Sequence, residues 1–193
     1  MKVVSPQLGL LVLAASVSAP ALAEDGFSYN YLEAAYFDTE IDDGDFDVDG
    51  DGLGIAGSVE LGESFFLEAS YGRQEFDFDI DVDQWTVGIG AHTPLSDAID
   101  LVGRVGYVDA EIDTDFGSAD DDGYLAGLGL RGRVAENFEL EGGVNYVDLD
   151  EGGDTTTFEF GGRFYLNPNF AIGAGVELDD DVTTWNAGVR FEF

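Results

Sequence analysis

Ten stretches of this chain alternate apolar residues with small or polar residues at a period of two. In the last of them, Trp185 and Phe193 share one face, whereas Asn186 and Arg190 share the other, as the side chains of a β-strand do. A single strand with this pattern could also belong to the sheet of a soluble protein. Ten such strands in succession, with no helical segment between them, predict apolar faces toward lipid and polar faces toward a lumen. The expected fold class is all-β, a transmembrane up-and-down antiparallel β-barrel.

Ten is an even number of strands, as in bacterial single-chain barrels, although eight would span the membrane if two outer hairpins were soluble. The connections after even-numbered strands are short and hold Pro94 and Pro168, which fits because proline cannot donate to a strand ladder. The predicted strands cover residues 27–37, 52–61, 65–78, 82–93, 99–110, 123–134, 138–149, 155–166, 170–178 and 182–193.

The first 23 residues have the features of a secretory signal peptide: a basic start at Lys2, an apolar core, and the small-residue sequence at 21–23. The predicted domains are therefore a signal peptide over 1–23 and an outer-membrane barrel over 24–193. No later apolar run approaches the roughly 20 residues of a transmembrane helix, so strands must span the membrane. The chain has no cysteine, which excludes a disulfide framework.

The sequence is strongly acidic, with a formal charge of -34 and a pI near 4.1. Such a chain cannot neutralise phosphates, so nucleic acid is excluded as a partner. With the amino terminus in the periplasm, the connections after odd-numbered strands lie outside the cell. These connections carry 27 of the 41 acidic residues, over residues 38–51, 75–83, 109–122, 148–154 and 179–181.

The alternation reverses its phase in these outer connections. Tyr107 faces lipid, but beyond it acids take the outward positions and Val108, Ala110 and Ile112 turn inward. Val147 and Leu149 do the same in a later strand, as do Phe76, Phe78, Ile80 and Val82 around the second outer connection. We expect the barrel to continue above the bilayer and to close on a small apolar core.

Charged residues concentrate on the predicted lumen face. Charges in a narrow barrel must be paired and hydrogen-bonded, so an Arg and Glu network that fills the lumen is expected, with inward glycines such as Gly127 leaving room for it. The first strand breaks the pattern, because Tyr29, Tyr31 and Glu33 share a face; it contains either a bulge or an inverted phase. The predicted network comprises Arg104, Arg131, Arg133, Arg163, Arg190, Glu60, Glu68, Glu141, Glu159 and Glu177.

A candidate metal site begins at Asp47, Asp49 and Asp51, whose alternate carboxylates and intervening glycine resemble the start of a calcium loop. The twelfth position is Ser58 instead of a bidentate glutamate, and a strand follows instead of a helix. Loose binding of Ca²⁺ or Mg²⁺ by the whole acidic rim is the favoured alternative, since such ions would bridge the carboxylates to lipopolysaccharide phosphates. No cofactor is otherwise expected.

The single histidine, His92, points inward at the periplasmic end of the fourth predicted strand. Barrel enzymes that act on lipids or peptides need a histidine near the outer rim or the lipid face, beside a carboxylate or serine. His92 lies at the other end, so no catalytic residue is predicted and the chain is not expected to be an enzyme. Arg73, at the outer side of the third strand, fits a rim salt bridge as well as a lipopolysaccharide contact.

The segments 28–33, 70–74, 83–88, 122–124 and 185–193 are similar to small bacterial outer-membrane β-barrel proteins, especially the acidic barrels of the Ax-twenty-one type. The resemblance spans the mature chain and rests on strand and girdle motifs. It implies an outer-membrane location in a Gram-negative cell, export in membrane vesicles, and folding by the barrel-assembly machinery that recognises a terminal aromatic strand, here ending at Phe193. It supplies no catalytic residues.

The expected function is that of a non-enzymatic integral barrel with a structural or surface-interaction role, an acidic extracellular rim and a charge-filled lumen. Its expected partners are outer-membrane lipid, lipopolysaccharide and the barrel-assembly machinery, and a monomer is expected. The alternative is a narrow porin-like channel for small solutes or ions, in which inward Arg and Glu line a path. Ten strands favour a filled lumen, because barrels of eight strands are just filled by side chains.

Overall fold

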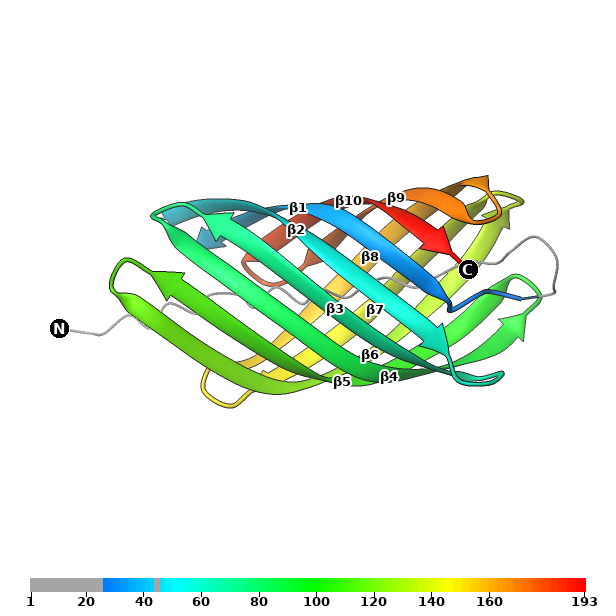
Figure 1. Cartoon of the computed structure of the whole chain (residues 1–193), viewed down its shortest axis with the longest axis horizontal. Coiled ribbons are helices and arrows are strands. Elements are labelled where there is room, and N and C mark those ends of the chain that lie inside the picture. Colours follow the sequence, from blue (N-terminus) through cyan, green and yellow to red (C-terminus); the bar gives the residue numbers. More distant parts are fainter. Residues whose placement is uncertain (1–25, 44–45) are drawn as a thin grey trace.

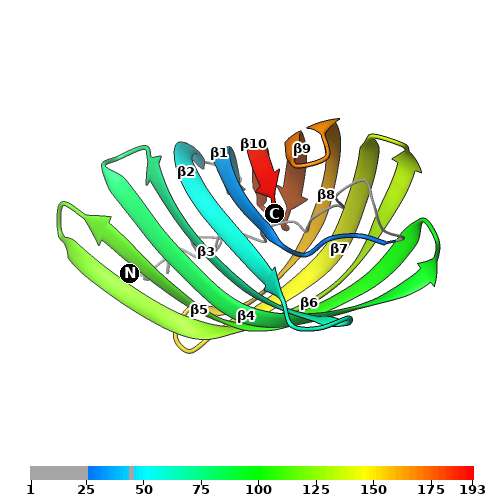
Figure 2. The same cartoon turned by 45° about the vertical axis from the view of Figure 1, so that its right-hand side comes forward.

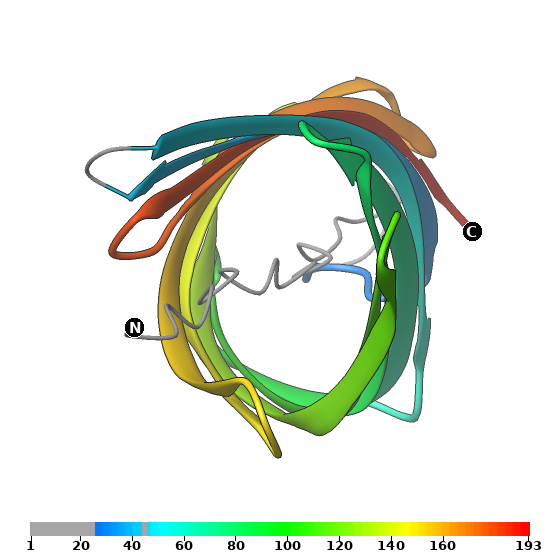
Figure 3. The ribbon, with the colours of Figure 1, turned by 90° about the vertical axis from the view of Figure 1, so that its left-hand side faces the viewer.

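The computed structural model describes residues 26–43 and 46–193, and these form a closed antiparallel barrel (Figure 1). Seen along its axis, the barrel is a single ring of tilted strands (Figure 3). The strands are β1 (Tyr31–Asp43), β2 (Phe46–Glu60), β3 (Phe65–Phe76), β4 (Ile80–Ser96), β5 (Ile99–Thr114), β6 (Gly117–Ala135), β7 (Phe138–Leu149), β8 (Gly153–Asn167), β9 (Phe170–Leu178) and β10 (Val182–Glu192).

Each strand pairs with the next, and β1 pairs with β10 to close the ring. The closing register runs from Tyr31 opposite Glu192 to Ile41 opposite Val182. Closure leaves no strand edge with unpaired backbone groups, which is what hydrocarbon requires of a sheet. The predicted all-β barrel is confirmed, with ten strands and not eight. No helix in the described part of the chain is long and apolar enough to cross a membrane.

The two ends of the barrel differ, as Figure 1 shows. The turns after even-numbered strands gather at the end that holds the carboxyl terminus, and the hairpins after odd-numbered strands form the opposite end. A membrane-spanning strand needs about 9–11 residues. Because β6 has 19 residues and β5 has 16, these strands continue beyond the bilayer.

The first outer connection is shorter than predicted. Residues 38–51 were expected to be a loop, but β1 continues to Asp43 and β2 begins at Phe46. The alternation of acids with apolar residues persists here, and Ile41 pairs with Val48 while Glu40 pairs with Asp49. The ladder therefore extends through most of the predicted loop.

The outer wall carries exposed apolar side chains over its middle and an aromatic belt toward the hairpin end. Trp85 and Tyr107 lie 5.4 Å apart between ring centroids, and Tyr107 lies 6.1 Å from Tyr124. Tyr71 donates a hydrogen bond to Asp83, next to this belt. Aromatic girdles of this kind stand at membrane interfaces. The belt therefore marks the outer boundary of the bilayer, with the acidic hairpins beyond it.

The first strand has an inverted phase and no bulge. β1 pairs with both neighbours without a register shift. Tyr31 is 1% exposed and faces the lumen, whereas Leu32 is 60% exposed on the outer wall. The strand also begins at Tyr31 and not at the predicted residue 27. The preceding residues belong to a segment that enters the lumen, and this is why Tyr29 shares the phase of Tyr31.

The predicted apolar core above the bilayer is confirmed by a buried cluster of Val108, Leu125, Val147 and Leu149. Phe78 was predicted to join such a core, and this was wrong. β3 ends at Phe76, and Phe78 lies in the hairpin turn with 75% of its surface exposed.

Inward glycines make room for large lumen side chains. A Cβ at Gly127 would lie 2.8 Å from Cγ of Arg104, and a Cβ at Gly90 would lie 2.0 Å from the Phe66 ring. Phe66 is fully buried and stacks on Tyr29, with 4.8 Å between the ring centroids. A side chain added at Gly90 therefore requires this packed ring to shift.

We predict that Gly90→Ala destabilises the barrel by about 1–3 kcal/mol, because the added methyl must displace a fully packed ring. Urea unfolding of the refolded protein in detergent measures the change, with heat-modifiable gel migration reporting the folded fraction. Gly103→Ala is the matched control, since the nearest atom to its Cβ lies at 4.0 Å. Equal stability of the two variants would contradict the proposed packing.

Candidate functional site

The lumen contains the charged residues predicted from the sequence. Arg104, Arg131, Arg163 and Arg190 are each at most 8% exposed, and Arg133 is half-buried at the carboxyl-terminal end of β6. The lumen carboxylates come from several strands and belong to Glu33, Glu60, Glu68, Asp100, Glu139, Glu141, Glu159, Glu177 and Glu192.

Arg131 and Arg163 form close ion pairs across neighbouring strands. Arg131 Nη2 lies 2.6 Å from Glu139 Oε2, and its Nε donates to the same oxygen at 3.0 Å. Arg163 Nη2 donates to Glu141 Oε1 at 3.0 Å. Arg133 adds a looser contact of 3.6 Å to the second oxygen of Glu139. β6, β7 and β8 thus present alternating charges on one side of the lumen.

Arg190 and Arg104 extend the network around the ring. Arg190 Nε donates to Glu33 Oε2 at 2.6 Å, and its guanidinium lies 3.8 Å from the centroid of the Tyr31 ring. This pair joins β10 to β1 across the closing seam. Arg104 makes a longer contact of 3.9 Å with Glu159. Buried charges arranged in this way neutralise one another and occupy the lumen.

Residues Gly26 to Asn30, here called the N-terminal segment, lie across the end of the lumen that holds the carboxyl terminus, the end expected to face the periplasm. Figure 2 shows the segment in blue where it leaves the start of β1, and Figure 3 shows it inside the ring of strands. Phe27 is 8% exposed and Tyr29 is fully buried. A segment that precedes the barrel in sequence therefore packs as part of its interior.

An aromatic stack fixes Tyr29 in this position. Its ring stacks on His92 with 4.0 Å between centroids, in addition to its contact with Phe66. Its hydroxyl donates to Asp100 Oδ2 at 2.9 Å, and His92 Nδ1 lies 3.2 Å from the same oxygen. Four side chains from the segment and from β3, β4 and β5 meet here.

Both ends of the N-terminal segment are held by lumen charges. The guanidinium of Arg131 lies 4.5 Å from the centroid of the Phe27 ring, and Arg133 Nη2 donates to the carbonyl oxygen of Gly26 at 2.9 Å. At the other end, Asn30 Nδ2 donates to Glu60 Oε2 at 2.9 Å. The same arginines that pair with carboxylates thus anchor the segment.

Carboxylates outnumber arginines in the described part of the lumen. Glu159 and Glu177 stand directly opposite each other on β8 and β9, and they line a chamber of about 20 Å³ together with Glu141 and Asn186. Glu159 Oε2 also accepts a hydrogen bond from Asn145 at 3.1 Å. A chamber of this size holds about one water molecule, so these carboxylates have little free space between them.

The outer end carries acids in register. The strand pairing puts Asp38 opposite Asp51, Asp51 opposite Glu75, Glu75 opposite Asp81, and Asp81 opposite Asp113. We call these five residues the acidic row; it crosses β1 to β5. Like charges directly opposite one another destabilise a sheet.

A single arginine stands beside the acidic row on the outer wall. Arg73 Nη2 donates to Asp81 at 2.7 Å, and Arg73 Nη1 lies 3.5 Å from Asp83. The carboxylates of Asp83 and Asp81 raise the pKa of Arg73. Arg73 therefore forms the rim salt bridge anticipated from the sequence and neutralises part of the row.

The candidate calcium residues lie on a strand and not in a loop. Asp49 and Asp51 are exposed at alternate positions of β2, so their Cα atoms are about 7 Å apart. The side chain of Asp47 lies outside the described residues. Among the described side chains, no three His, Asp or Glu residues are grouped so as to hold a metal ion.

His92 and Phe193 both lie at the end of the barrel that holds the carboxyl terminus. His92 is sandwiched in the aromatic stack, and no serine or threonine is hydrogen-bonded to it among the described residues. Phe193 is 60% exposed, and its backbone N–H donates to the carbonyl oxygen of Asn30 at 3.3 Å. The predicted signal peptide, residues 1–23, lies outside the described residues.

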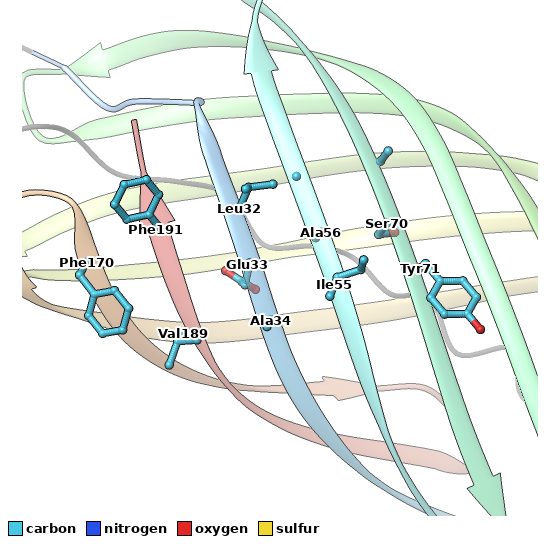
Figure 4. A pocket seen from close by; sticks show the side chains of 12 residues that line it. Leu32, Glu33, Ala34, Ile55, Ala56, Ser70, Tyr71, Phe170, Val189 and Phe191 are labelled. Atoms are coloured by element: carbon cyan, nitrogen blue, oxygen red, sulfur yellow. The ribbon is translucent and has the colours of Figure 1, made fainter.

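A groove of about 580 Å³ lies on the outer wall, where β10, β1, β2 and β3 meet (Figure 4). Leu32, Ile55, Tyr71 and Phe191 stand around it, and small residues such as Ala34 form its floor. Most of the side chains that line this hollow are apolar.

The N-terminal segment was missed by the sequence prediction. One pattern could have revealed it: Phe27, Tyr29, Tyr31 and Glu33 keep a single phase, and Glu33 belongs with the lumen charges. When side chains at alternate positions already face inward before the first strand begins, the residues that carry them are predicted to lie inside the barrel. Asn145, buried beside Glu159, was also missed, because a single asparagine has no distinguishing periodicity.

A family model described as "Outer membrane protein beta-barrel domain" matches residues 9–193. The chain belongs to this family of outer-membrane β-barrels. Among curated proteins, no relative matches the sequence significantly. The narrower resemblance to the Ax-twenty-one type stays a prediction.

Solved structures of other outer-membrane barrels share the fold. An outer-membrane channel from Pseudomonas putida F1 is 11% identical with a TM-score of 0.52, over 88% of this chain and 97% of that one. The translocator domain of the autotransporter NalP from Neisseria meningitidis is 17% identical with a TM-score of 0.52, over 89% and 91%. The KdgM porin in complex with oligogalacturonate is 9% identical with a TM-score of 0.50, over 84% and 99%. At these identities the likeness concerns the fold alone.

We predict that Arg131→Met destabilises the barrel by about 3–5 kcal/mol, because the buried carboxylate of Glu139 loses its close partner and keeps only the looser contact with Arg133. The double variant Arg131→Met/Glu139→Leu should recover at least half of the loss, since apolar residues of similar volume replace a buried pair well. Urea unfolding in detergent measures both changes. A single variant as stable as the unmodified protein would show that the pair is not buried.

Proposed function

We propose that this protein is a closed, non-enzymatic barrel of the outer membrane that acts at the cell surface through its acidic outer end. The observation that carries this proposal is the occupied lumen. The N-terminal segment lies across one end of the lumen, ion pairs such as Arg163–Glu141 lie farther inside, and the buried apolar cluster around Val108 packs toward the hairpin end. With a blocked interior, the exposed outer hairpins are the part of the molecule available to partners.

The absence of an enzymatic role is part of this proposal. The single histidine of the sequence is engaged with Tyr29 and Asp100 at the periplasmic end, on the lumen side of the wall. A hydrolase of the outer membrane needs a nucleophile and a base open to substrate. This arrangement supports a structural role for His92, as an anchor of the N-terminal segment.

We also propose that residues 1–23 direct export and that the terminal strand ending at Phe193 is recognised by the barrel-assembly machinery. A terminal aromatic side chain exposed at the periplasmic end supports this role for Phe193. The protein is proposed to act as a monomer, because the ring closes within one chain. A Gram-negative outer membrane supplies lipid and lipopolysaccharide as its surroundings.

The first prediction from this proposal concerns conductance. Purified barrel inserted into planar bilayers should give no steady single-channel steps, because the proposed barrel has a blocked lumen. A general porin in the same preparation provides the control for insertion and detection.

A narrow channel is the second candidate, and the surplus of lumen carboxylates such as Glu159 and Glu177 favours it. Steady, cation-selective conductance that falls with Glu159→Gln would establish the channel and overturn the closed barrel. Unselective leakage that Glu159→Gln leaves unchanged would instead indicate damaged bilayers.

The second prediction concerns divalent cations at the acidic row. We propose that Mg²⁺ or Ca²⁺ binds loosely there and bridges the carboxylates to lipopolysaccharide phosphates, since like charges in register repel one another. Added Mg²⁺ should raise the thermal unfolding midpoint more than NaCl of equal ionic strength, and EDTA should reverse the gain. Glu75→Gln/Asp113→Asn should reduce the response. An identical effect of the two salts would show that the acidic row is a solvated surface that does not bind divalent cations.

A further inference from the structure

Two neighbouring outer hairpins end in an exposed phenylalanine. Phe116 lies in the turn between β5 and β6 and is 101% exposed, and Phe78 lies in the turn between β3 and β4 and is 75% exposed. These are the two most exposed large apolar side chains in the described part of the chain. Both stand in water beyond the aromatic belt, where neither lipid nor the barrel core covers them.

Phe78 also has an unusual backbone. Its φ is +67°, and the next residue, Asp79, has a φ of +56°. A bulky residue rarely adopts the left-handed region, in which glycine or asparagine is common. The turn therefore holds an exposed aromatic side chain at a position where a glycine would be less strained. Neither the fold nor the turn geometry requires a phenyl ring there.

The two hairpins belong to neighbouring strands. β4 pairs with β5 as far as Asp81 opposite Asp113, and the turns that hold Phe78 and Phe116 lie beyond this last pair at the same end of the barrel. Figures 1 and 2 both show the two hairpins as neighbours at the same end of the barrel. We call the pair Phe78 and Phe116 the phenyl tips. They present two exposed apolar groups, on neighbouring hairpins, among the acidic residues of this end.

Carboxylates surround the phenyl tips. Asp77 and Asp79 flank Phe78, and Asp115 precedes Phe116; Asp77 and Asp115 are exposed. This field repels anionic partners, including lipopolysaccharide phosphates without a bridging cation. It attracts cations, and an apolar group is needed to cover each ring. The surface therefore matches a partner that combines positive charge with apolar side chains.

We propose that the phenyl tips and their flanking carboxylates form a docking surface for a cationic, amphipathic polypeptide. The proposal rests on the proposed function, in which the outer end is the working surface, and it names the chemical class of the partner. Lysine or arginine side chains would meet Asp77 and Asp115. Apolar side chains of the same polypeptide would cover Phe78 and Phe116, and burial of rings of this kind dominates many protein interfaces.

The experiment uses two synthetic peptides of equal charge: a lysine hexamer that carries two leucines, and the same peptide with two serines. Binding to the mature barrel in nanodiscs of neutral lipid is measured by fluorescence anisotropy, with empty nanodiscs as background. We expect the leucine peptide to bind about tenfold more tightly than the serine peptide, because its leucine side chains cover the phenyl rings. Added salt should weaken both peptides, because charge attracts both.

Two sets of variants separate the rings from the charges. Phe78→Ser/Phe116→Ser should remove the advantage of the leucine peptide and leave the serine peptide unchanged. Asp77→Asn/Asp115→Asn should weaken both peptides by similar factors. Heat-modifiable migration confirms that each variant is folded, and Phe116→Ser alone provides the same test if the double variant does not fold.

Equal binding of the two peptides to the unmodified barrel would overturn the docking surface and leave only an acidic field. The same conclusion would follow if Phe78→Ser/Phe116→Ser kept the tenfold preference. The outcome is independent of conductance. A barrel that gives no conductance and binds the two peptides equally would contradict this inference alone. A barrel that conducts would contradict the proposed function.

Discussion

The closing pairing between β1 and β10 is the constraint on which the rest of the structure depends. Backbone groups in hydrocarbon must all be hydrogen-bonded, and a sheet satisfies this only as a ring. Ten strands make a ring whose interior is narrow enough for side chains to fill. Every inward residue is therefore confined with its neighbours, and every inward charge must find an opposite charge or a hydrogen bond. Glycines such as Gly127 provide the space in which those side chains pack.

The narrow ring also explains the position of the N-terminal segment. Arg131 serves two purposes, because it neutralises Glu139 and lies against Phe27. A cation between a carboxylate and an aromatic ring is stabilised from both sides. The segment and the ion pairs thus stabilise one another. This mutual packing supports the proposed closed interior, in which the outer hairpins are the surface open to partners.

The period-two pattern was sufficient to predict the fold, the strand count and the apolar cluster around Val108. Each strand has one apolar face and one polar face, so apolar and polar residues must alternate along it. The sequence did not reveal the length of the outer hairpins, since acids alternate as regularly beyond the bilayer as apolar residues do within it. Phe78 was misplaced because periodicity does not show where a strand turns. The pairing partners of each arginine were also beyond prediction, because they depend on the stagger of the strands around the ring.

The barrel holds Tyr29 in the lumen against His92 and Phe66. Solution NMR of the isotope-labelled mature barrel in neutral-lipid nanodiscs tests this most directly. Nuclear Overhauser contacts between the ring of Tyr29 and the rings of His92 and Phe66 are the predicted result. Random-coil chemical shifts for residues 26–30, without those contacts, would contradict it.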